Sequence, residues 1–432
     1  MLWQVDVPGP ACWQPDRRRP SHIQEEHLNY AENGLPAWLG VAFEWSEELD
    51  PRPLTRAILG WVDRHEALRR RFAKDGPAIT SATVGPGKSI VHRTELGYYI
   101  DRTELARSLK NVFDAQTSPL RWPPYALATV SRPGSTTILL ASDHAITDLY
   151  SLASVPHDLT QLYIAAVRGV RPKLAPVQSY LDYAEAERVR LTESAVNGHA
   201  IEHWRELIEA NAGQLPHFPL PLGVQDQTMQ RSGRMWLLDP VGTREFDRAC
   251  RTENANTAVG LFAGLALAGK RLADHQDFQT VAPFHTRDDL RWRGSFGWYV
   301  GMSPLHFRVP DGFPELLRVT RLELVRAKET ARVPFSKAME LLGVRLRDRF
   351  MVSYMDLRKV PGSNCWARWR TSFLISCNAD PHEAYFWINR SHEGICVNFR
   401  HPGTATARTS TDNYLAEFAA LSRRISGALP RF

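Results

Sequence analysis

The stretch ILLASDHAITDLYSL, residues 138–152, places a histidine and an aspartate four residues apart where an apolar run ends. Before it, STTILLAS (135–142) is short, β-branched and apolar and follows the turn-forming RPG, which predicts a buried strand. After it, apolar residues recur at steps of three and four over residues 152–166, which predicts an amphipathic helix. His144 and Asp148 therefore lie on a predicted strand-to-helix connection, where side chains with a chemical function are often presented.

The composition is that of an ordinary globular protein. The chain has 432 residues, of which 43% are hydrophobic, enough for a substantial core and for two or three domain-sized units. No apolar run approaches the roughly 18 residues of a membrane-spanning helix. The first 20 residues lack the basic-then-apolar order of a signal peptide. We therefore expect a cytoplasmic protein.

Cysteines and charge narrow the classes of ligand. The five cysteines are odd in number, far apart and never in a C-x-x-C arrangement, which indicates neither a disulfide framework nor a zinc site. A net charge of +6 favours acidic partners such as phosphorylated cofactors or acidic proteins. Nucleic acid fits less well, because no basic run is longer than three residues, and RRR at 69–71 continues a helical pattern over 54–72 and is interpreted as its solvated face.

The order of the predicted elements suggests two mixed α/β halves. Helical patterns include a small-residue-rich helix over 256–273 and a closing helix over 413–425, and strand-like runs include FQTVAPF at 278–284. A polar stretch with two prolines at 168–178 interrupts the periodicity. We place the boundary there, with one half at residues 1–172 and the other at 173–432.

Five stretches, in order along the chain, carry a resemblance to a known family. SDHAITDLYS falls on the active-site motif His-His-x-x-x-Asp-Gly of the condensation-domain superfamily, and the chain resembles that superfamily over nearly its whole length. The other stretches resemble its Ser-x-x-Gln motif, its Arg-His-Glu-x-Leu-Arg helix, its later Gly-Arg region and a segment most similar to polyketide-associated acyltransferases. They are RPSHIQEEH (19–27), DRHEALRRRF (63–72), HTRDDLRWRGSFGWYVGMSPL (285–305) and VSYMDLRKVPG (352–362).

The resemblance implies an α/β (α+β) fold of two chloramphenicol-acetyltransferase-like subdomains in a V, with a tunnel between them. In that family a thioester donor enters one mouth of the tunnel and a nucleophilic acceptor enters the other. Two positions depart from the motif. The family's first histidine is Asp143 here, a site-supporting position, and its glycine is Leu149, which we expect to narrow the passage for the donor's pantetheine arm.

His144 is the expected general base. A neutral imidazole titrates nearest to neutral pH, and acyl transfer to an alcohol or amine requires removal of the acceptor's proton. The sequence lacks a G-x-S-x-G nucleophile motif, which agrees with direct transfer. By family analogy Asp148 completes the catalytic motif without facing the substrate and pairs with Arg287, so that it holds the loop.

The remaining site candidates are donors to the oxyanion and the wall of the tunnel. The backbone amide near Leu149 and the hydroxyls of Ser303, Ser353 and Tyr354 are candidates for the oxyanion. Trp298 is expected to line the core or the tunnel. Neither His-Glu pair in the C-terminal region has the second histidine of a zinc-hydrolase helix, so no metal and no bound cofactor are expected.

These observations predict a stand-alone acyltransferase that works as a monomer. The acyl donor would be a coenzyme A thioester or a phosphopantetheinyl carrier protein acting in trans, and the acceptor a hydroxyl or amine of a natural product or lipid. Ester formation is slightly favoured. The alternatives are an amide-forming condensation enzyme and a catalytically inactive docking domain, which Asp143 and Leu149 keep open. Neither nucleic acid nor a membrane span is expected.

Overall fold

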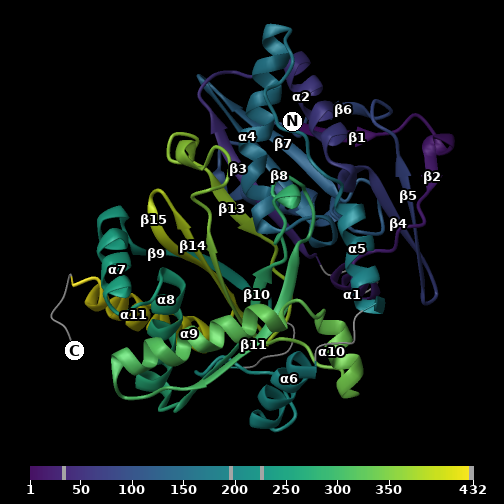
Figure 1. Cartoon of the computed structure of the whole chain (residues 1–432). Helices are drawn as coiled ribbons and strands as arrows, with labels where there is room; N and C mark the ends of the chain where they lie inside the picture. The colour runs from purple at the N-terminus through teal and green to yellow at the C-terminus, as the bar shows by residue number, and fades with distance from the viewer. Residues whose placement is uncertain (32–35, 194–197, 224–227, 428–432) are drawn as a thin grey trace. The chain divides into compact units, whose positions relative to one another are not determined.

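The computed structural model describes residues 1–31, 36–193, 198–223 and 228–427 and divides into two compact units (Figure 1). Unit 1 comprises Met1–Ala195, Arg287–Tyr299 and Lys359–Ser376, and unit 2 comprises the three remaining segments. The first segment of unit 1 therefore runs past residue 172, and two later segments join it. The subdomain boundary at 172/173 stays a prediction.

Unit 1 contains a six-stranded antiparallel sheet and a smaller sheet of three strands. One face of β3 places Trp38 and Ala42 in an apolar core with Leu109 and Phe113 of α3. Helix α4 contacts β3 and packs against α2. The large sheet has the order β13 (Ser372–Ile375), β3 (Trp38–Trp45), β8 (Ser135–Asp143), β7 (Tyr125–Arg132), β1 (Leu2–Asp6), β6 (Ile90–Thr94); the small one is β2 (Trp13–Pro15), β5 (Ala78–Val84), β4 (Arg70–Asp75); the helices are α1 (His22–Tyr30), α2 (Pro51–Arg64), α3 (Arg102–Gln116), α4 (Leu149–Arg168) and α5 (Tyr180–Glu193).

The predicted helix over 54–72 is shorter than expected, and the interpretation of RRR as a solvated helix face is wrong. Helix α2 ends at Arg64, and after a 3-10 turn the chain enters β4 at Arg70. Arg69 and Arg70 are buried, and only Arg71 is exposed. Arg69 Nη1 donates to the Val84 carbonyl (2.5 Å), so this cation satisfies a backbone acceptor of the small sheet.

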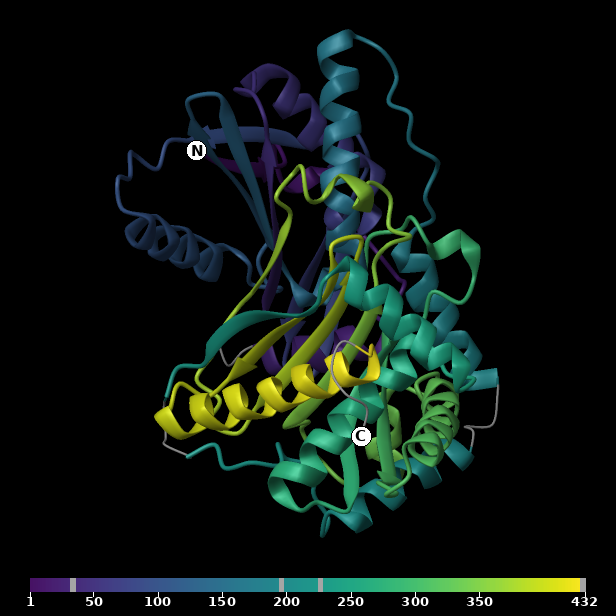
Figure 2. The ribbon, with the colours of Figure 1, turned by 90° about the vertical axis from the view of Figure 1, so that its left-hand side faces the viewer.

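Unit 2 contains a second six-stranded sheet, in which β12 runs parallel to both of its neighbours and the other pairs are antiparallel. Helices α7, α8, α9 and α11 share one core with the sheet, and Figure 2 shows the yellow α11 beside its strands. Helices α6 and α10 form a separate core with β10 and β11. The sheet order is β11 (Val300–Arg308), β10 (Asp277–His285), β12 (Phe350–Asp356), β14 (Ala384–Ser391), β15 (Gly394–His401), β9 (Arg231–Leu238); the helices are α6 (Gly198–Ala210), α7 (Pro240–Thr252), α8 (Thr257–Ala273), α9 (Phe313–Thr330), α10 (Phe335–Leu342) and α11 (Ala405–Ile425).

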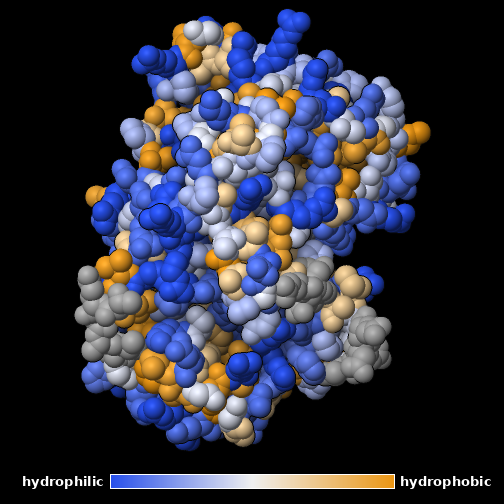
Figure 3. Space-filling model, turned by 90° about the vertical axis from the view of Figure 1, so that its right-hand side faces the viewer, coloured by the Kyte–Doolittle hydropathy of each residue, from blue (hydrophilic) through white to orange (hydrophobic). Residues whose placement is uncertain are grey.

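The face drawn in Figure 3 is mostly hydrophilic, as expected for a globular protein with this composition. Hydrophilic residues cover most of the face drawn in Figure 3, with hydrophobic residues scattered among them, as is usual for a surface in contact with water. Within the described ranges, none of the helices combines the length and the apolar character needed to cross a membrane. Both units mix helices with a sheet, as the predicted fold class requires.

Candidate active site

Within SDHAITD, residues 144–146 form a single 3-10 turn between strand β8 and helix α4, and an aspartate precedes each of the two helical segments. Asp143 accepts a hydrogen bond from the Ala145 amide (2.8 Å) and caps the turn, which is named η4 (His144–Ile146). Asp148 accepts from the Ser151 amide (2.7 Å) and caps α4. His144 is therefore held in the connection at the end of the strand, as predicted, and its own amide donates to the Ala37 carbonyl (3.0 Å).

The imidazole of His144 is half-buried and lies against Trp298. The two ring centroids are 3.9 Å apart, with the planes tilted by 30°. Nδ1 is buried and has no hydrogen-bond partner among the residues that the structure describes. Burial lowers the pKa of His144 to about 4, and the positive charge of His27 acts in the same direction. The ring is therefore neutral at pH 7, which is the form that accepts a proton.

Asp148 and Arg287 form the predicted ion pair, and both side chains are buried. Arg287 Nη2 lies 3.1 and 3.2 Å from the two carboxylate oxygens of Asp148. The same carboxylate accepts from the amides of Ser151 and Tyr299 (3.0 Å). The other guanidinium nitrogen, Nη1, donates to the carbonyls of Trp292 and Ser295, each at 2.7 Å. The pair therefore fixes the start of α4 to segment 287–299.

Two small residues complete this attachment and were not predicted from the sequence. The Ser151 hydroxyl donates to the Gly297 carbonyl (2.9 Å) and accepts from the Gly297 amide (3.1 Å). A Cβ at Gly297 would lie 2.2 Å from Cδ2 of Tyr180, so glycine is needed for this close approach. Tyr180 in turn donates to the Trp298 carbonyl (2.9 Å). Together these contacts place the ring of Trp298 against His144.

Helix α1 contacts the other side of the turn through the residues of its Ser-x-x-Gln motif. Ser21 and Gln24 form a capping box, and Gln24 Nε2 also donates to the Ala145 carbonyl (2.6 Å). One turn later on α1, His27 Nε2 donates to Oδ1 of Asp143 (2.9 Å). The sequence motif pointed to Ser21 and Gln24, but His27 was missed because its partner lies 116 residues away.

The remaining predicted residues are placed as follows. Leu149 is the first residue of α4 and is half-buried. Ser303 and Ser353 are buried on β11 and β12, and burial raises the pKa of the neighbouring Tyr354 to about 12. These three hydroxyl residues belong to unit 2, whereas His144 belongs to unit 1. Their role toward an oxyanion stays a prediction.

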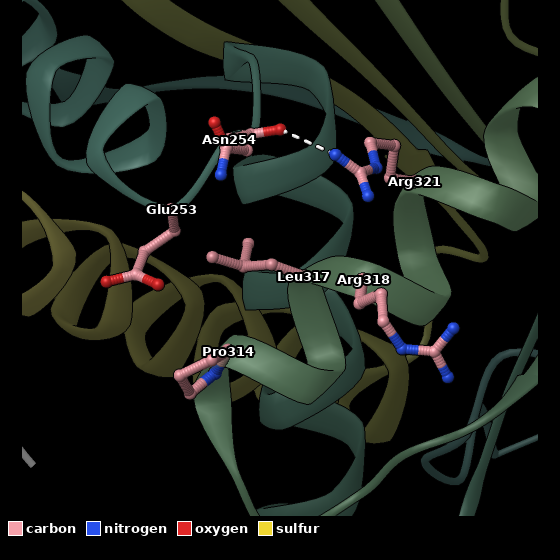
Figure 4. A pocket seen from close by; sticks show the side chains of 6 residues that line it. All are labelled: Glu253, Asn254, Pro314, Leu317, Arg318 and Arg321. Carbon is pink, nitrogen blue, oxygen red and sulfur yellow. Dashed lines mark hydrogen bonds between the residues drawn. The ribbon is translucent and has the colours of Figure 1, made fainter.

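A separate surface depression of about 510 Å³ lies in unit 2, beside the start of α9 (Figure 4). Its rim carries Arg318 and Arg321, which are exposed, and Arg321 donates to the Asn254 carbonyl (3.0 Å). Glu253, Pro314 and Leu317 complete the lining. Nothing in this lining resembles the buried polar arrangement around His144. Within the described part of the chain, no group of three or more histidine, cysteine or acidic residues is arranged to hold a metal ion.

The chain is similar to condensation domains and to acyltransferases that are related to them. The family model described as Condensation domain matches residues 36–349. Trehalose-2-sulfate acyltransferase PapA2 of Mycobacterium tuberculosis is 25% identical over 421 residues, which cover 93% of this chain and 88% of that protein.

Solved structures resemble the whole fold. The structure of PapA2 acyl transferase superposes with a TM-score of 0.85 at 22% identity and covers 98% of this chain and 96% of that one. The first condensation domain of the CDA synthetase gives a TM-score of 0.75 at 19% identity, with coverage of 94% and 96%. These matches confirm the predicted mixed α/β fold class, whereas the V arrangement and the tunnel stay predictions.

Proposed function

The chain belongs to the condensation-domain family and is an acyltransferase, and we propose that it moves an acyl group from a pantetheine thioester to a hydroxyl group of a small-molecule acceptor. The single observation that carries this proposal is the placement of the His144 imidazole in a turn that the Asp148–Arg287 pair and Gln24 hold in position. A ring that stays unprotonated at neutral pH is ready to accept the acceptor's proton.

The proposed reaction is a direct transfer in which His144 acts first as a base and then as an acid. Nδ1 is buried without a hydrogen-bond partner among the described residues, so we assign the role of proton acceptor to the other ring nitrogen, Nε2. Nε2 takes the proton of the acceptor's O–H while the oxygen attacks the thioester carbon. The C–S bond then breaks, and the thiolate of the pantetheine takes the proton from the imidazolium. No covalent acyl-enzyme is needed, because both substrates meet at one histidine.

The relatives and the charge of the chain suggest the chemistry of the acceptor. PapA2 is named for trehalose-2-sulfate, a sugar that carries one anionic group. A net charge of +6 attracts such an anion as well as the phosphates of coenzyme A or the acidic surface of a carrier protein. We therefore propose a sulfated or otherwise anionic polyol as the first acceptor to test, with ester formation ahead of amide formation.

The test is an acyl-transfer assay read by mass spectrometry. The parent protein is incubated with acyl-coenzyme A or an acylated carrier protein and with trehalose-2-sulfate, trehalose or an amine of similar size. We expect a product heavier by one acyl group, and a rate lower by about 10² to 10⁴ in His144→Ala. The matched control is His157→Ala, which removes another half-buried histidine from unit 1. Equal rates for His144→Ala and the parent would falsify the assignment of the base.

A further inference from the structure

The turn that carries His144 has a second acidic residue whose partner lies on another element. Asp143 stands where the condensation motif has its first histidine. Its carboxylate is buried and caps the turn through the Ala145 amide. The same oxygen, Oδ1, accepts a hydrogen bond from Nε2 of His27 at 2.9 Å. Position 143 thus carries an aspartate in place of the motif's histidine, and helix α1 supplies a histidine that hydrogen-bonds to it.

His27 lies between the turn and the ring that covers His144. Its imidazole contacts Trp298 edge to face, with centroids 5.5 Å apart, while Trp298 lies against His144 at 3.9 Å. Gln24 is three residues earlier, so both side chains project from one face of α1. Gln24 holds the Ala145 carbonyl and His27 holds Asp143, which gives the turn two anchors on the same helix.

We propose that His27 is a positioning residue for the transfer: paired with Asp143, it holds the His144 turn against α1, and the charge balance of the pair acts on the imidazole of His144. This inference rests on the proposed function only for its kinetic test. The pair itself is a feature of unit 1, to which His27, Asp143 and His144 all belong.

The charges around the two histidines agree with this role. Burial alone would lower the pKa of His27, but the Asp143 carboxylate, with Glu26 on the same helix, outweighs it and raises that pKa. The charged groups that act on His144 are His27, which opposes its protonation, and Asp143 and Asp148, which favour it. Asp148 is already neutralised by Arg287. Removing the charge of His27 therefore leaves Asp143 as the uncompensated neighbour of His144.

The test compares His27→Gln, Asp143→Asn and their combination with the parent. Glutamine keeps a hydrogen-bond donor but no charge, and asparagine keeps the oxygen that caps the turn. In His27→Gln we expect the pKa of His144 to rise by about one pH unit, the size that a neighbouring charge produces in a partly buried site. In the double variant both charges are absent, and we expect the pKa of His144 to return toward the parent value.

Two readouts separate this inference from the proposed function. The first is an NMR titration of protein labelled at histidine, with the His144 signal assigned by its loss in His144→Gln; it requires no substrate. The second is the pH profile of kcat/KM, whose acid limb should move up by the same amount in His27→Gln. His22→Gln is the matched control, because it makes the same change at the start of α1.

The outcomes are distinct. The positioning role is overturned if His27→Gln changes neither the pKa of His144 nor the acid limb of the kcat/KM profile and unfolds at the same midpoint as His22→Gln. That outcome leaves the acyltransferase proposal intact. A moved His144 signal in a protein that transfers no acyl group to any acceptor supports the pair and overturns the proposed reaction. A uniform loss of kcat with an unmoved pKa also counts against the charge that we assign to His27.

Discussion

Replacing Asp148 with alanine should destabilise unit 1 far more than the loss of an ordinary helix cap. The Asp148 carboxylate accepts from the amides of Ser151 and Tyr299 and from Arg287 through both of its oxygens. Arg287 is only 5% exposed, so the variant leaves a buried guanidinium without its counter-charge. Breaking such a pair from one side costs about 3 to 5 kcal/mol. An exposed cap alone is worth about 0.5 to 2 kcal/mol.

Urea unfolding followed by tryptophan fluorescence measures this difference. With an m-value of about 2 to 3 kcal/mol/M, a loss of about 3 to 5 kcal/mol lowers the midpoint by about 1 to 2.5 M. The matched control is Asp101→Ala, which removes the exposed cap of α3 in the same unit. We also expect the double variant Asp148→Ala with Arg287→Ala to lose less than the sum of the two single variants, because it strands no charge. A midpoint shift in Asp148→Ala no larger than that in Asp101→Ala, or single losses that add, would show that no buried charge is stranded.

Three other changes test the site. As the pH falls from about 6.5 to 4, the free energy of unfolding of the parent should decrease more than that of His144→Gln. An unfolded histidine binds a proton near pH 6.5, whereas folded His144, with its pKa lowered to about 4, does not. Parallel curves of urea midpoint against pH for the two proteins would contradict this. Gly297→Ala should cost about 1 to 3 kcal/mol through its contact with Tyr180. Thermal unfolding checks it against Gly85→Ala, whose Cβ would meet nothing within 4 Å, and equal melting temperatures would disprove it. Leu149→Gly, which restores the residue of the family motif, should raise kcat/KM for acyl-pantetheine donors, and a value at or below that of the parent argues against a narrowed passage.

The sequence predicted those parts of the site that depend on residues close together along the chain or on recognisable motifs. The strand before His144 and the helix after it follow from periodicity, whereas the pairing of Asp148 with Arg287 was expected only from the resemblance to the family. The end of α2 was missed because residues 65–69 continue the helical spacing, while burial of Arg70 in the small sheet decides the outcome. Contacts such as His27 with Asp143 depend on how distant segments meet, which spacing along the chain does not encode.

Segment 287–299 also bears on how the protein is made. Asp148 leaves the ribosome 139 residues before Arg287, and the intervening chain includes the whole of Val196–Thr286, which belongs to the other unit. At about 5 to 20 residues per second, that interval lasts roughly 7 to 28 s. During this time the nascent N-terminal part holds a carboxylate destined for burial without its cation. A fragment ending at residue 195 would remain in that state permanently, so a truncated first unit is a poor starting point for biochemistry or for engineering.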